Sequence, residues 1–172
     1  ETGRDELLRA AAVGRQATTA ATCIVVLLAN AAVAAAVALS LVLYPLATAD
    51  SVALGIGVGL AGLCFGAVAL LAAQLTSTSR ATYGVTGAVI GLAYALRAVG
   101  DVGEPALSWL TPIGWYQAMH AFSGLRWWPA LLLVLMTFAT VAAAYAVFQR
   151  RDYGSGVIAA RPGPPRAATG LA

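Results

Sequence analysis

The residue types that commonly carry out chemistry are few in this 172-residue sequence and lie far apart. His120 is the single histidine, and no carboxylate or cysteine stands near it at the spacing of a metal-ligand set. Cys23 and Cys64 both fall inside long apolar runs, where a thiol usually packs as a small hydrophobic group. No serine, histidine and carboxylate combination suits nucleophilic catalysis. The sequence therefore predicts neither an active site nor a metal site, and no cofactor bound by this chain.

Glycines form the one pattern that imitates a nucleotide site. Gly55, Gly57 and Gly59 could be mistaken for a phosphate-binding loop, but they lie within an apolar stretch with no strand before them and no lysine after them. Glycines also recur four residues apart, at positions 55 and 59, 62 and 66, and 87 and 91. This spacing predicts helices that approach each other closely within lipid.

A few polar side chains interrupt the apolar runs. Asn30 and Gln74 are such residues, and a polar group in lipid usually faces other helices or a water-filled path. Asn30 is the better candidate for lining a substrate path. Arg97 and Asp101 stand four residues apart, which predicts a structural ion pair if the helix continues between them.

The overall composition explains why chemistry is scarce. Hydrophobic residues make up 60% of the chain and charged residues 10%, with a mean hydropathy of +0.83. Soluble domains average roughly 45–50% apolar and about 25% charged residues. The ten basic residues are all arginine and flank the apolar runs, so they indicate membrane topology and not nucleic-acid binding. The arginine, alanine and glycine content is typical of a GC-rich bacterial genome, and we expect an integral membrane protein of the bacterial plasma membrane.

Four segments are long and apolar enough to cross a bilayer as helices, which takes roughly 20 residues each. The predicted spans are residues 17–46, 51–75, 81–99 and 128–148, within a transmembrane domain of residues 17–151. Short turns at 47–50 and 76–80 and a long connection at 100–127 join them. Residues 152–172 are rich in glycine and proline and are predicted to form a disordered cytoplasmic tail. The predicted fold class is an all-α, polytopic transmembrane bundle.

Arginines predict the orientation of the spans. They precede the first span, follow the second at Arg80 and follow the fourth, so these regions and both ends should be cytoplasmic. The connection at 100–127 should lie outside. Its aromatic residues suit the headgroup region, as an ordinary interfacial loop or as a re-entrant segment. The residues that mark this outer segment are Trp109, Pro112, Trp115 and Tyr116.

Residues 1–16 form a charged stretch before the first span. Asp5 and Arg9 can pair at i,i+4, while Leu7, Leu8 and Ala11 share one face of a predicted amphipathic helix. Two interpretations remain open. The helix rests on the anionic cytoplasmic leaflet, or it docks onto a cytoplasmic partner.

Four motifs, in order along the chain, carry a family resemblance. The run GRDELLRAAAVGR at residues 3–15 resembles the cytoplasmic coupling segment of ABC-2 type exporter permeases, with Ala12 where members often have proline. The remaining stretches are similar to the actinobacterial polyketide-antibiotic, tetronasin-type exporter branch of these permeases. They are QLTSTSR at 74–80, LRAVGD at 96–101 and LSWLTPIGW at 107–115.

The resemblance implies a transport function without catalysis by this chain. A separate nucleotide-binding ATPase, using ATP and Mg²⁺, would push on the coupling segment, and the cargo would be an amphipathic or hydrophobic compound such as an antibiotic or drug. The residues that would contact the ATPase are Gly3, Arg4, Glu6, Leu7, Leu8, Arg9, Val13 and Arg15.

The resemblance also implies an architecture. A permease half in this family has six spans, so Glu1 would begin after the second span, and a second half would complete the pore as a dimer or a fused chain. The outer connection would then be the family's extracellular re-entrant element. The alternative is a small multi-pass scaffold or assembly protein without transport, which would need no ATPase.

Overall fold

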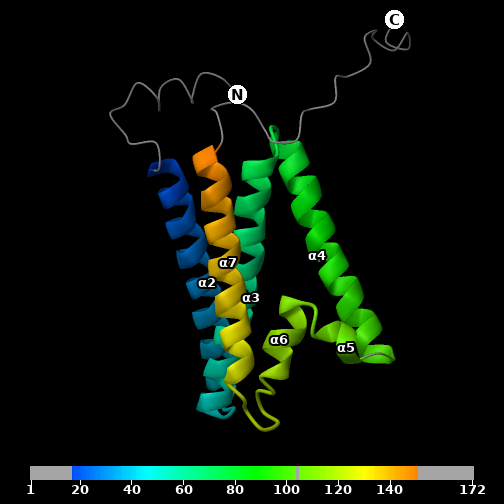
Figure 1. Ribbon diagram of the computed structural model, residues 1–172. Helices are drawn as coiled ribbons and strands as arrows, with labels where there is room; N and C mark the ends of the chain where they lie inside the picture. The colour runs from blue at the N-terminus through cyan, green and yellow to red at the C-terminus, as the bar shows by residue number, and fades with distance from the viewer. Residues whose placement is uncertain (1–16, 104, 151–172) are drawn as a thin grey trace, which may run out of the picture.

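The computed structural model describes residues 17–103 and 105–150, which form helices and no strand (Figure 1). Four long helices dominate the fold, and two short helices lie between the third and the fourth. Four of these helices are long and apolar enough to cross a membrane, which confirms the predicted all-α polytopic bundle. The long helices are α2 (Ala17–Leu43), α3 (Thr48–Leu75), α4 (Ser79–Val102) and α7 (Trp128–Arg150), and the short ones are α5 (Pro105–Ser108) and α6 (Pro112–Ala118).

Local chemistry sets the ends of these helices. α2 ends at Leu43, three residues earlier than predicted, because Pro45 lacks the backbone N–H that a longer helix would need. α3 already begins at Thr48, so the predicted turn at 47–50 is wrong and Asp50 lies in the first turn of a helix. There its negative charge suits the positive end of the helix dipole.

The later helices are longer than the sequence suggested. α4 runs from Ser79 to Val102 where 81–99 was expected, and the side chain of Thr78 caps it by accepting from the backbone N–H of Ala81 at 3.3 Å. α7 continues to Arg150 where Phe148 was expected. The outer connection is correspondingly shorter than the predicted 100–127.

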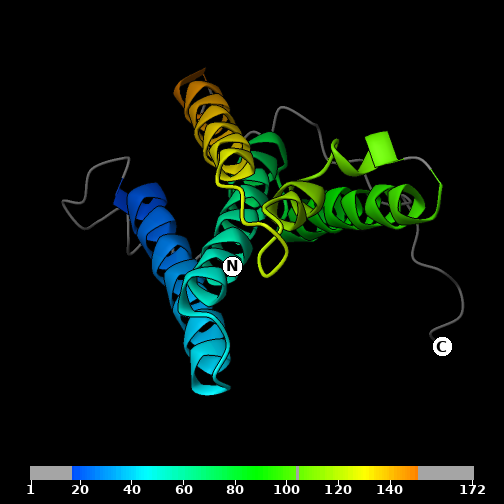
Figure 2. The ribbon, with the colours of Figure 1, turned by 90° about the horizontal axis from the view of Figure 1, so that it is seen from below.

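α3 is the central helix of the bundle. It packs against α2, α4, α6 and α7, whereas the Cα atoms of α2 and of α4 stay more than 8 Å from those of α7 among the described residues. Figure 2 shows α2 and α4 lying on different sides of α3. α2, α4 and α7 therefore all pack on α3, and α4 also packs on α5 and α6.

Glycines on α3 allow the close approach of α2. A Cβ atom on Gly55 would overlap the backbone oxygen of Ala34, and one on Gly59 would lie 2.8 Å from the Cβ of Ala34. Gly62 and Gly66 meet the side chains of Asn30 and Val26 in the same way. The predicted role of these glycines in helix packing holds for this interface.

The expected close approach at Gly87 and Gly91 is not found. Together with Gly84, these residues lie on α4, and a Cβ atom at any of them would meet nothing within 4 Å in the described part of the chain. The physical reason is the course of α4, which leaves α3 after the turn at residues 76–78 and diverges from it along its length (Figure 1). A small-residue face brings two helices together only when a second helix lies opposite it.

The two ends of the bundle contain different parts of the chain. The start of α2, the turn between α3 and α4, and the end of α7 lie at one end, and the α2–α3 turn, α5 and the loop before α7 lie at the other (Figure 1). Arg80, in the first turn of α4, therefore lies at the end where α2 begins and α7 ends, and Asp50, in the first turn of α3, lies at the opposite end. We refer to these as the Arg80 end and the Asp50 end.

Candidate functional site

Two adjoining cavities form a groove on α3, between α2 and α7. The larger has a volume of about 550 Å³ and the smaller about 180 Å³, and both are lined by Cys23, Leu70 and Val141. Both α2 and α7 pack on α3, and no Cα atom of α2 lies within 8 Å of one in α7. α3 therefore forms the floor of the groove and the flanking helices form its walls. The groove runs from the Arg80 end toward the middle of the helices.

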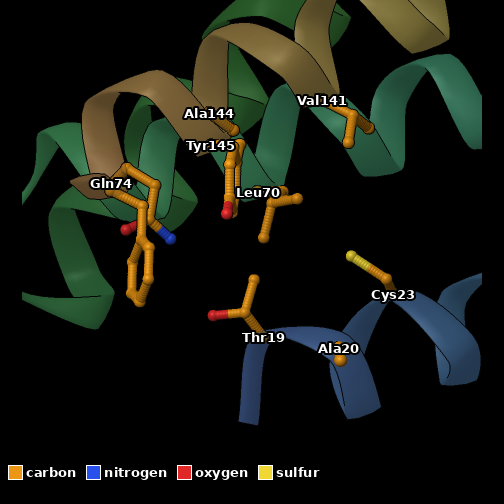
Figure 3. A pocket seen from close by; sticks show the side chains of 9 residues that line it. Thr19, Ala20, Cys23, Leu70, Gln74, Val141, Ala144 and Tyr145 are labelled. Atoms are coloured by element: carbon orange, nitrogen blue, oxygen red, sulfur yellow. The ribbon is translucent and has the colours of Figure 1, made fainter. Parts of the chain in front are cut away.

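The lining of this groove changes in character along its length. The larger cavity is almost wholly apolar, with residues such as Val26, Leu63 and Phe138 from its three helices. The smaller cavity, nearer the Arg80 end, adds polar groups, and Figure 3 shows Thr19, Gln74 and Tyr145 around the same space. A groove with an apolar interior and a polar mouth can accept a molecule with a polar head and an apolar body.

Asn30 lies beside this groove in the interface between α2 and α3. Its amide nitrogen donates to the backbone oxygen of Val26 at 2.9 Å, and its side chain packs directly over Gly62. Val26, one turn earlier on α2, lines the larger cavity, whereas Asn30 is not among the lining residues. The role of Asn30 in a substrate path stays a prediction.

The α3–α7 interface is joined by a buried thiol. The Sγ atom of Cys64 donates to the backbone oxygen of Leu133 at 3.2 Å and lies 3.2 Å from the Oγ1 atom of Thr137. Cys64 and Leu133 are fully buried and form a cluster with Ala61. Cys64 therefore has a packing role in the described structure, as the sequence predicted for a thiol in an apolar run.

The outer segment of the prediction corresponds to α5, α6 and the loop that follows. Pro112 occupies the start of α6, where its missing N–H is harmless, and Thr111 caps the helix by accepting from the N–H of Gly114 at 3.0 Å. Trp115 and Tyr116 pack against the buried cluster around Cys64. These two aromatic residues therefore fasten α6 to α3 and α7.

Trp109 has a different role from Trp115. Its ring stacks on Trp128 with centroids 5.2 Å apart, and its backbone oxygen accepts from the indole N–H of Trp115 at 2.6 Å. Trp109 remains 42% exposed. The aromatic residues singled out in the sequence thus form one packed group at the Asp50 end.

Arg97 brings together more of the chain than the sequence indicated. The predicted ion pair with Asp101 is present, since α4 continues through both residues. The guanidinium also donates to the side-chain oxygen of Gln117 on α6, and to the Oγ atom of Ser108 on α5 at 3.1 Å. The i,i+4 spacing predicted the contact with Asp101, but no local sequence pattern identifies Ser108 and Gln117, eleven and twenty residues further along, as partners.

The loop before α7 is fixed by a carboxylate. A side-chain oxygen of Asp50 accepts from the backbone N–H of Phe122 at 3.1 Å. His120 and Phe122 both have positive φ angles, of 51° and 68°, which non-glycine residues rarely adopt. The hydrogen bond from Asp50 helps to hold this turn against the start of α3. His120 is an exposed residue of this loop. Within residues 17–103 and 105–150, no group of histidine, cysteine and carboxylate side chains could hold a metal ion.

The predicted coupling residues lie outside the described residues. These are Gly3, Arg4, Glu6, Leu7, Leu8, Arg9, Val13 and Arg15, and the tail of residues 152–172 is outside as well. The described chain starts at Ala17, directly after the predicted coupling segment, at the Arg80 end of the bundle.

The sequence was compared with those of known proteins to find proteins that it resembles. No protein-family model matches the sequence. Over 163 residues, however, the chain is 40% identical to the multidrug efflux system permease protein Rv1217c of Mycobacterium tuberculosis (strain ATCC 25618 / H37Rv). This chain is similar to an efflux permease. The alignment covers 95% of this chain but 30% of the length of that relative.

Proposed function

We propose that this chain belongs to the membrane-spanning permease of an ATP-driven ABC-2 type exporter, which moves amphipathic or hydrophobic compounds out of the bacterial cell. The observation that carries this proposal is the 40% identity to a multidrug efflux permease across almost the whole chain. Four apolar helices of spanning length agree with such a role. The motifs that resemble the tetronasin-type branch point to antibiotics as one class of cargo.

An ATPase subunit would supply the energy, using ATP and Mg²⁺ that this chain does not bind. The sequence at residues 3–15 supports this partner, because it resembles a coupling segment. That segment precedes Ala17, at the Arg80 end, where arginine favours a cytoplasmic location. In the proposal, both ends of the chain and the coupling segment are cytoplasmic, and α5 and α6 lie outside.

More protein is expected around this bundle. The chain spans 30% of its relative's length, and α4 has large exposed side chains, with Tyr83 77% exposed and Tyr94 69%. Its face of small residues at Gly84, Gly87 and Gly91 is open. These three observations support a second permease half, from another chain or a fused one, packed beside these four helices.

The groove between α2 and α7 supports the proposed cargo class. Its apolar interior suits the body of a hydrophobic compound, and Thr19 and Gln74 at its mouth can form hydrogen bonds with a polar head. Asn30 remains a proposed path residue on the basis of its polarity within α2.

Affinity purification from native membranes in mild detergent, followed by an ATP hydrolysis assay, tests the proposal. We expect an ATPase to co-purify with the unmodified protein and to be lost when Leu7→Asp and Leu8→Asp are introduced together. Ala167→Asp with Ala168→Asp adds the same charge in the C-terminal segment and should leave the ATPase bound. A folded protein that brings down no ATPase would contradict the proposal and favour a scaffold.

A further inference from the structure

The groove between α2 and α7 lies on the side of α3 that faces away from α4. Figures 1 and 2 both show α2 and α7 on one side of α3 and α4 on the other. A second permease half that packs on the open face of α4, as proposed above, would therefore leave the groove uncovered. The groove then faces the lipid, and a molecule dissolved in the bilayer can enter it from the side.

The polar mouth of the groove lies at the ends of its three helices. Thr19 is in the first turn of α2, Gln74 is next to the last residue of α3, and Tyr145 is near the end of α7. Their side chains surround one space in Figure 3. Because the ends of membrane-spanning helices lie close to the membrane surface, this mouth is at the depth where an amphiphile has its polar head.

Beyond the mouth the groove is long and apolar. Along α3 its lining extends from Gln74 to Leu60, which corresponds to about 21 Å at a rise of about 1.5 Å per residue. The hydrocarbon core of one leaflet is about 15 Å thick. Thr137 is one of the few polar residues in this part, and its hydroxyl already donates to the backbone oxygen of Leu133 at 2.8 Å. The groove therefore fits an elongated apolar body.

The charges around the groove restrict the head of such a molecule. Among the described residues that line the two cavities, none carries a charged side chain. Moving an ionised group into such a site is costly unless an opposite charge meets it. Arg80 and Arg150 lie at the same end of the bundle and disfavour a cation there. An uncharged head that forms hydrogen bonds suits the mouth best.

From these observations we infer that the groove is the loading site for an amphiphile with an uncharged polar head and an elongated apolar body. The molecule enters from the cytoplasmic leaflet, with its head between Thr19 and Gln74 and its body along α3, and the neutral amide of Gln74 sets the preference for an uncharged head. The loading role rests on the proposed transport function. Occupancy of the groove rests on its lining and is measured without transport.

Cys23 reports occupancy directly, because it lines both cavities whereas Cys64 is fully buried. The full protein in lipid nanodiscs is treated with N-ethylmaleimide, and alkylation of Cys23 is followed by mass spectrometry. Dodecylglycerol at about ten times its dissociation constant should slow alkylation about ten-fold. Dodecyltrimethylammonium, a cation with the same chain, should slow it only about two-fold at that concentration, because it binds about ten-fold more weakly. No protection by dodecylglycerol would overturn the site, and equal protection by both would overturn the preference.

Blocking the groove provides a second test. Ala69→Phe places a large side chain in the larger cavity, so dodecylglycerol should no longer change the alkylation rate of this variant. Ala35→Phe adds the same side chain at an exposed position of α2 outside the lining and should leave protection intact. Protection that survives Ala69→Phe would contradict binding in the groove.

A change of charge tests the role of Gln74. Gln74→Glu supplies the missing negative charge and should raise protection by dodecyltrimethylammonium from about two-fold to about ten-fold. Gln149→Glu adds the same charge at an exposed position near the end of α7, outside the lining, and should leave protection at about two-fold. An equal rise in both variants would overturn the assignment of the preference to Gln74.

The loading role is tested by ATP-dependent uptake of a fluorescent, uncharged dodecyl amphiphile into inside-out vesicles. Ala69→Phe should abolish uptake, whereas Ala35→Phe should retain it. Uptake that persists in Ala69→Phe, although dodecylglycerol no longer protects Cys23, would overturn the loading role and identify the occupant as a membrane lipid. If the unmodified protein shows no uptake at all, the proposed function fails, while protection of Cys23 still decides whether the groove binds the amphiphile.

Discussion

The interface of α2 with α3 and the open face of α4 use the same residue type for opposite outcomes. In the first, glycines at 55, 59, 62 and 66 lie against atoms of α2, and in the second, glycines at 84, 87 and 91 meet nothing within 4 Å in the described chain. Sequence spacing cannot distinguish these cases, because it records the size of the side chain and not the presence of a neighbour. The comparison shows that a glycine-spaced helix has a packed interface only where the topology supplies a second helix.

The largest effect should come from adding one methyl group at the tightest contact. Gly55→Ala places a Cβ atom against the backbone oxygen of Ala34 and 3.0 Å from the Cβ of Ala38, and backbone cannot move aside as a side chain can. We expect a loss of about 1–3 kcal/mol in the free energy of unfolding. Reversible unfolding in mixed micelles measures it, and an unchanged value would mean that α2 does not pack this closely.

A smaller effect is expected at Gly62, where the obstacle is a side chain. Gly62→Ala would collide with the amide of Asn30, which is held by its bond to Val26, so we expect a loss of about 1 kcal/mol in unfolding free energy. Adding Asn30→Ala should recover most of that loss. If the double variant is as unstable as the sum of the single variants, the two residues are not in contact.

A substitution at the α3–α7 interface should have a weaker effect still, because it removes a hydrogen-bonding group and adds no atom to a close contact. Cys64→Ala removes the thiol that lies between Leu133 and Thr137. Hydrogen bonds between helices in membranes contribute about 0.6 kcal/mol on average, so the unfolding free energy should fall by about that amount plus a small packing loss. Cys64→Ser keeps a hydrogen-bond donor, so it should lower the unfolding free energy less than Cys64→Ala when both are measured by reversible unfolding in mixed micelles.

A glycine-to-alanine substitution on the open face of α4 should not destabilise the protein, in contrast to Gly55→Ala. Gly87→Ala meets no atom in the described chain, and alanine favours a helix over glycine, so the free energy of unfolding should be unchanged or rise by up to about 1 kcal/mol. This variant is the matched control for Gly55→Ala in the same isolated chain. Destabilisation in the full-length complex but not in the isolated chain would indicate that a partner helix occupies this face.

The sequence predicted where the helices lie in the chain better than it predicted which helices pack against one another. Apolar length fixed four spans, and the i,i+4 spacing identified the ion pair of Arg97 with Asp101, because both signals are local. The turn predicted at 47–50 is wrong because an acidic residue such as Asp50 suits the first turn of a helix as well as a loop.

Long-range contacts could not be predicted from the sequence in the same way. The partners of Arg97 on α5 and α6, and the contact of Gly57 with Tyr116, depend on how α6 folds back against α3. Nothing in the local sequence of α3 or α6 specifies that α6 packs against α3. The groove between α2 and α7 arises for a similar reason, since it depends on both helices packing on α3 with their backbones apart.

Uptake of a fluorescent amphiphile into inside-out membrane vesicles tests the central claim most directly. The account predicts that vesicles containing the protein and its ATPase accumulate the compound when ATP and Mg²⁺ are added, and that Leu7→Asp with Leu8→Asp abolishes accumulation while the protein remains in the membrane. Accumulation that is the same with and without ATP, or that persists in the double variant, would contradict an ATP-driven permease coupled through this segment.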